Sequence, residues 1–92
     1  MNIAHVEFEL AEALMHLQAL VTSFREHRIQ PEDTPELSVD LNHVLEHLCY
    51  AWNSKDLSTE EILALPQDEF NRLCDTVPNF NATKVMGETA CC

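Results

Sequence analysis

The first third of the chain carries a helical pattern of apolar residues. Between Asn2 and His27 they recur at alternating three- and four-residue steps, the spacing of one face of an α-helix. This stripe consists of Ile3, Val6, Leu10, Ala13, Leu17, Leu20 and Phe24, widened by Leu14 and Val21. Glu9, Glu12 and His16 fall toward the other side. The pattern predicts a helix nearly ~40 Å long that needs an apolar partner along its whole length.

A second amphipathic pattern follows a short proline-containing loop. The loop spans residues 30–35 and holds Pro31 and Pro35, so the first helix is expected to end near Arg28. Asp33 or Thr34 is expected to cap the next helix. From residue 36 to residue 52 one helical face carries Leu37, Leu41, Val44, Leu45, Leu48, Ala51 and Trp52. Because the loop is short, the two long helices are expected to form an antiparallel hairpin.

Two short helices are predicted in the C-terminal half. Ser58 and Glu61 have the spacing of a capping box, which opens a helix that Pro66 ends. Residues 67–75 form the next short helix, and no stretch of the chain has a strand pattern. We therefore predict an all-α fold in one domain over residues 1–80. Residues 81–92 are expected to be a flexible tail.

Chain length predicts self-association. A domain of 92 residues buries only a modest share of its surface, roughly 60 to 68% of what the unfolded chain exposes. The second helix is too short to cover the whole apolar stripe of the first. We therefore expect a homodimer that completes a bundle, with Leu10, Leu17 and Phe24 in its interface.

The charge balance excludes two classes of partner. The chain has 16 acidic and 5 basic residues, a net charge of -11 and a pI near 4.5. Such a surface repels phosphate groups, so direct nucleic-acid binding and adhesion to anionic membranes are not expected. No apolar run approaches the ~18 residues of a membrane span, and no leader-like segment is visible, which favours a cytoplasmic protein with thiol cysteines.

The acidic residues are concentrated after residue 30. There, acids lie beside apolar anchors at two predicted helix starts, a set made of Glu60, Glu61, Ile62, Asp68, Glu69 and Phe70. Charge beside apolar anchors suits docking to a protein partner with a basic surface. The same acids also fit a purely structural role, because negative charge stabilises the first turn of a helix.

His43 and His47 form the clearest candidate site for chemistry. Histidines four residues apart on a helix point the same way and can share a metal ion, with Asp40 as a further ligand. Two imidazoles leave a zinc tetrahedron half empty, so we expect zinc affinity no tighter than about micromolar. The segment also matches the H-x-x-E-H signature of inverted zinc proteases, but 92 residues supply neither a third ligand nor a cleft of that kind. Solvated side chains with local pairing between Asp40 and His43 are the simpler interpretation.

No catalytic arrangement or cofactor motif emerges. Cys49 and Cys74 lie at apolar helix faces and are expected to be buried thiols. The pattern as a whole favours a non-enzymatic protein–protein interaction module, such as an adaptor, regulator or assembly subunit. One alternative is a metal-binding or metal-responsive helical protein that uses His43 and His47. Another is an acidic mimic that blocks a nucleic-acid-binding protein.

Overall fold

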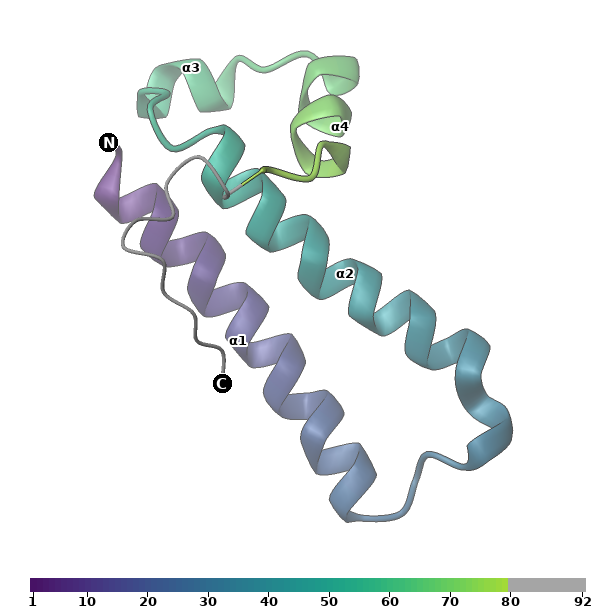
Figure 1. Cartoon of the computed structure of the whole chain (residues 1–92). Coiled ribbons are helices and arrows are strands. Elements are labelled where there is room, and N and C mark those ends of the chain that lie inside the picture. The colour runs from purple at the N-terminus through teal and green to yellow at the C-terminus, as the bar shows by residue number, and fades with distance from the viewer. Residues whose placement is uncertain (80–92) are drawn as a thin grey trace, which may run out of the picture.

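The computed structural model describes residues 1–79, which form α-helices packed against each other (Figure 1). The prediction of an all-α fold is confirmed, and the described residues contain no strand. The helices are α1 (Ile3–Arg25), α2 (Thr34–Asn53), α3 (Thr59–Leu63) and α4 (Gln67–Asp75), with a short 3-10 turn, η1 (Pro31–Asp33), before α2. The predicted tail, including Cys91 and Cys92, lies outside the described residues.

Specific caps begin and end α1. The side chain of Asn2 accepts a hydrogen bond from the backbone N–H of His5, while its own N–H and amide group donate to the carbonyls of Lys55 and Leu57. The helix ends at Arg25, three residues before the predicted end. It ends there because His27 adopts a left-handed conformation with φ of 57°, and the chain then turns back on the last helical carbonyls.

α2 begins two residues earlier than predicted. Pro35 lies in its first turn, where the missing N–H costs nothing. Asp33 occupies the cap position, but its carboxylate accepts a hydrogen bond from the backbone N–H of Gln30 at 2.8 Å instead of capping α2. The two extra residues, Thr34 and Pro35, make α2 continuous in sequence with η1, which ends at Asp33.

The two short helices begin where the sequence places them. Ser58 and Glu61 form the predicted capping box, with the backbone N–H of Ser58 donating to the Glu61 carboxylate at 2.8 Å and the N–H of Glu61 donating to the Ser58 hydroxyl at 3.1 Å. α4 starts directly after Pro66 and has the predicted bounds.

The described residues include no helix long and apolar enough to cross a membrane.

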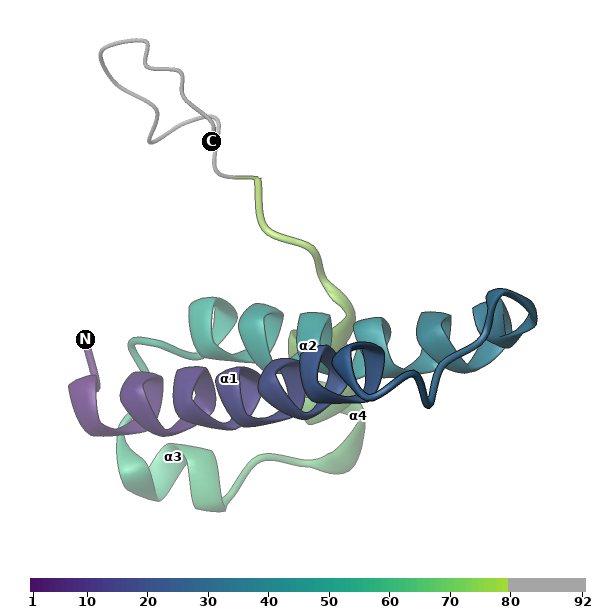
Figure 2. The same ribbon diagram turned by 90° about the horizontal axis from the view of Figure 1, so that it is seen from below.

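α1 and α2 lie side by side and run in opposite directions (Figure 1). α3 lies below the plane of this pair in Figure 2, and α4 packs against α2. Two contacts hold α4 in place: the rings of Tyr50 and Phe70 meet edge to face at 4.9 Å, and the Asn53 amide donates to the carbonyls of Leu73 and Thr76 at 2.8 and 2.7 Å. These bonds satisfy carbonyls at the end of α4 that the helix itself leaves free.

The contact between α1 and α2 buries only part of the apolar stripe on each helix and leaves the rest exposed. Ala13 and Leu20 of α1 are buried in this contact, as are Val44 and Ala51 of α2. The prediction that Glu9 falls on a solvent side is wrong, because Glu9 is only 8% exposed. α2 packs along one edge of the α1 stripe, so polar residues at that edge enter the interface while the other edge stays uncovered.

Candidate functional site

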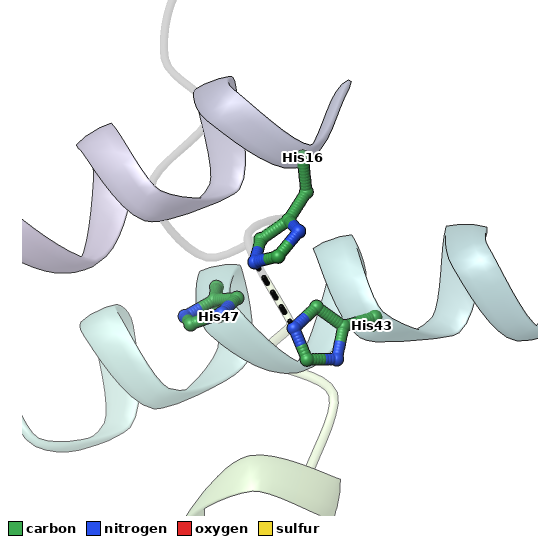
Figure 3. A group of neighbouring side chains, drawn as sticks. All are labelled: His16, His43 and His47. Atoms are coloured by element: carbon green, nitrogen blue, oxygen red, sulfur yellow. Dashed lines mark hydrogen bonds between the residues drawn. The ribbon is translucent and has the colours of Figure 1, made fainter. Parts of the chain in front are cut away.

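Three histidines converge between α1 and α2 (Figure 3). His16 comes from α1, and His43 and His47 come from successive turns of α2. One possible ligand atom from each ring lies within 4.8 Å of the others. The Nε2 atoms of His16 and His43 are 3.2 Å apart, so one nitrogen donates a hydrogen bond and the other accepts it when no ion is bound.

The helix geometry explains how the three rings meet. His43 and His47 are four residues apart and therefore share a side of α2. His16 follows Ala13 by three residues and precedes Leu20 by four, which places it on the side of α1 that contacts α2. The His16 ring stacks on His47 with centroids 5.3 Å apart, and His43 approaches the His16 ring edge-on at 4.3 Å.

Glu9 holds the third histidine of the cluster in place. Its Oε1 atom lies 2.8 Å from Nδ1 of His47, and both side chains are well covered. A carboxylate at Nδ1 favours the tautomer in which that nitrogen carries the proton. The Nε2 atom of His47 is then the nitrogen with a free lone pair, which is the atom that would bind a metal ion.

A hollow of about 380 Å³ adjoins the cluster. Its lining is Glu9, His43, Glu46, His47, Tyr50, Phe70, Asn71, Cys74 and Asp75. Burial, with Glu46 as the next largest cause, raises the pKa of the Cys74 thiol to about 11, and burial also raises the pKa of Tyr50. Neither group supplies a ready nucleophile near neutral pH. The prediction of a buried thiol is confirmed for Cys49, while Cys74 is half-buried.

The structure joins two of the predicted metal ligands and adds a third. His43 and His47 lie together, whereas Asp40 is not part of the three-residue group and lines a neighbouring hollow with His16 and His43. Sequence reasoning missed His16 by assigning it to the far side of the helix. The signal that could have found it is its helical spacing from Ala13 and Leu20.

The acids predicted for docking make helix-start contacts. Glu61 belongs to the capping box, Asp68 accepts a hydrogen bond from the next backbone N–H at 2.9 Å, and Glu69 forms a two-point ion pair with Arg72. This pairing lowers the pKa of Glu69. Phe70 packs on Tyr50. The remaining members of the set are the exposed Glu60 and the half-buried Ile62. A docking role for this set stays a prediction.

A second candidate surface is formed by the uncovered edges of α1 and α2, which we call the apolar face. It consists of Leu10, Leu14, Leu17, Val21 and Phe24 on α1 and Leu41, Leu45, Leu48 and Trp52 on α2. Each of these side chains is between 37% and 55% exposed. A soluble monomer rarely leaves so many large apolar side chains uncovered on adjoining helices.

The two helices present these residues on the same side. Leu14 directly follows the buried Ala13, and Leu45 directly follows the buried Val44, so each is turned about 100° from the helix contact. Because the helices run in opposite directions, an equal turn on each brings both stripes to one side of the pair. His43 directly precedes Val44 and turns to the other side. The apolar face and the histidine cluster therefore lie on different sides.

No protein-family model, curated protein or solved structure matches this chain. Its function is therefore inferred from its own residues. Two features are suited to binding something outside a single chain: the uncovered apolar face and the cluster of three histidines.

Proposed function

We propose that this chain is a protein-interaction module, an antiparallel helical hairpin that assembles through its apolar face, with a second copy of itself as the first partner. The observation that carries the proposal is the extent of apolar surface left uncovered on this face. The chain has 16 acidic residues, yet nine large apolar side chains on one side of the helix pair are each between 37% and 55% exposed. Exposed apolar surface of this extent stabilises a complex when a partner covers it.

The dimensions of the face suit a weak dimer. The face runs along ~21 Å of α1 and ~17 Å of α2 and is ~20 Å wide, so it presents about 400 Å² per copy, or about 800 Å² in a pair. That total is below the ~1,200 to 2,000 Å² of stable protein interfaces, so we expect a dimer that dissociates on dilution. Two antiparallel hairpins stacked face to face make a four-helix bundle, which needs no third component. A two-fold axis lets each copy use the same patch.

A dimer of this kind would carry two acidic C-terminal regions on its outside. Glu60 and Asp68 are exposed, and within residues 1–79 no side-chain hydrogen bond or ion pair joins them to another helix. They are available to attract a protein with a basic surface, as expected of an adaptor, regulator or assembly subunit. Self-association would then double the valency of this acidic surface.

Charge inserted into the apolar face tests the proposal. Leu17→Asp places a carboxylate in the middle of the face, and Leu63→Asp places one on α3, where Leu63 is 82% exposed and outside the face. We expect the wild-type chain and Leu63→Asp to be dimers at ~100 µM and Leu17→Asp to be a monomer with unchanged helix content. Sedimentation equilibrium and circular dichroism measure the two properties.

A second variant covers the case in which Leu17→Asp unfolds. Leu45→Asp introduces the same charge from α2, and it should also give a folded monomer. A wild-type monomer at ~100 µM would contradict the proposal. So would a dimer that persists in both variants, because a different surface would then hold it together.

A further inference from the structure

We propose that His16, His43 and His47 form a binding site for a divalent transition-metal ion, with zinc as the best fit, at the contact between α1 and α2. The site is independent of the proposed dimer, since it lies away from the apolar face. It differs from the pair that the sequence indicates, because the third ligand comes from another helix. An ion bound there would crosslink α1 to α2.

The distances are close to those of a bound state. Zinc binds imidazole nitrogen at 2.0–2.1 Å, so two nitrogens of a tetrahedral site lie ~3.3 Å apart. The Nε2 atoms of His16 and His43 are already 3.2 Å apart. Ligand atoms of all three rings lie within 4.8 Å of one another. His43 is exposed and the other two rings are half-buried, so side-chain rotation is enough to close the remaining gap.

The buried Glu9 is an independent observation in favour of a metal site. Metal-binding histidines commonly donate their second ring N–H to a carboxylate, which orients the ring and raises its basicity. Glu9 accepts at 2.8 Å from Nδ1 of His47, and this carboxylate is itself buried at the helix contact. The hydrogen bond to Glu9 therefore orients the His47 ring and leaves its Nε2 atom available to an ion.

The ligand set selects the class of ion. Three imidazoles suit zinc, copper, nickel and cobalt, whereas magnesium and calcium require oxygen ligands. Three protein ligands also leave a fourth tetrahedral position for water or a small anion. The hollow beside His43 and His47 gives such a ligand space. The net charge of -11 raises the local concentration of cations around the whole chain.

The opposing interpretation is a hydrogen-bonded seam that needs no ion. His16 bonds to His43, His47 bonds to Glu9, and among the described residues no buried side-chain nitrogen or oxygen lacks a partner. A seam of this kind holds the helices together but has no preference for a metal. Stoichiometric binding that depends on all three rings separates the two interpretations.

Cobalt and zinc titrations of the full-length chain provide the test. Replacing Cys91 and Cys92 by serine first removes thiols that could bind metal elsewhere. We expect one Co²⁺ per chain, with the visible absorption of a tetrahedral site and without the charge-transfer band of a thiolate ligand. Zinc should displace the cobalt and raise the melting temperature.

Single-residue variants assign the ligands. His16→Ala should weaken zinc binding by at least ~10-fold, and Glu9→Gln by ~10- to 100-fold, the usual cost of losing a supporting carboxylate. His27→Asn is the matched control, because His27 is exposed beyond the end of α1 and asparagine accepts its left-handed conformation, and this variant should bind as the parent does. His16→Gln repeats the first test with a larger polar side chain, in case the alanine variant loses helix content.

Two results would overturn the site. One is the absence of stoichiometric zinc binding at ~100 µM protein. The other is binding that His16→Ala and His16→Gln leave unchanged in a folded chain. The Leu17→Asp variant keeps this test separate from the dimer, because a monomer should bind the ion as tightly as the parent.

Discussion

The hydrogen bond between Glu9 and His47 offers a quantitative test of how α1 and α2 are held together. Their side chains are 11% and 21% exposed, and the two atoms are 2.8 Å apart. His47→Leu leaves the Glu9 carboxylate buried without its partner, a change that costs ~3 to 5 kcal/mol for a fully buried pair. Since the adjoining hollow admits water, we expect about 2 to 3 kcal/mol of lost unfolding free energy.

Replacing Glu9, alone or together with His47, should lower the free energy of unfolding by less than replacing His47 alone. Glu9→Met leaves a neutral imidazole that loses one hydrogen bond, which costs ~1 to 2 kcal/mol. Combining Glu9→Met with His47→Leu removes both polar groups and fills the space with apolar atoms, so the double variant should lie within ~1 kcal/mol of the parent. The single changes therefore sum to much more than the double change, a coupling of about 2 to 6 kcal/mol.

Urea unfolding followed by far-ultraviolet circular dichroism measures these differences. All variants are compared at one protomer concentration and with a chelator present, so that neither assembly nor a bound ion contributes unequally. The same cycle at Glu69 and Arg72, whose side chains are 40% and 60% exposed, is the control and should show a coupling of at most ~0.5 kcal/mol. Coupling below ~0.5 kcal/mol at Glu9 and His47 would refute the reasoning, because the pair would then act as two independent surface groups.

Three further predictions concern the cysteines, alkaline pH and the acidic region. The pKa of Cys74 is about 11 in the folded chain against an ordinary value of 9.0, so at pH ~8 the folded chain should contain ~100-fold less Cys74 thiolate than the chain unfolded in urea. The rate of reaction with Ellman's reagent measures this difference once the tail cysteines are changed to serine. Folding also raises the pKa values of Cys49 and Tyr50, so as pH rises these groups lose their protons in the unfolded chain before they do so in the folded chain. The free energy of unfolding should therefore fall as pH rises above about 9. Cys74→Ala should make this fall with pH less steep, as measured by urea unfolding. Glu60→Gln combined with Asp68→Asn should slow association with a basic partner and flatten its salt dependence in stopped-flow measurements, with the melting temperature almost unchanged; a lower melting temperature with unchanged binding would instead mean that these acids only start helices.

Local signals in the sequence were sufficient for most helix bounds. The capping box at Ser58 and the break at Pro66 act within a few residues, so they define α3 and α4 without reference to the rest of the fold. The end of α1 was placed too late, because the left-handed turn at His27 involves a residue type that gives no strong signal for it.

The sequence could not show which edge of each stripe forms the helix contact. Apolar residues on α1 cover a wide arc, and a partner helix can pack along either edge of such an arc. Contact occurs at Ala13, and this choice buries Glu9 and brings His16 to α2. The histidine cluster is therefore a consequence of tertiary packing, since His16 and His43 are 27 residues apart in sequence.

Trp52, the single tryptophan of the chain, gives the apolar face a natural spectroscopic reporter. The residue is 37% exposed, and the ammonium group of Lys55 lies 4.2 Å from the centre of the indole ring. Covering the indole would remove water from its excited-state environment and shift its emission to the blue, whereas an ion at the histidines lies on a different side of the helix pair. Intrinsic fluorescence on dilution therefore follows assembly without a label, and it can do so in the same cuvette in which metal is titrated.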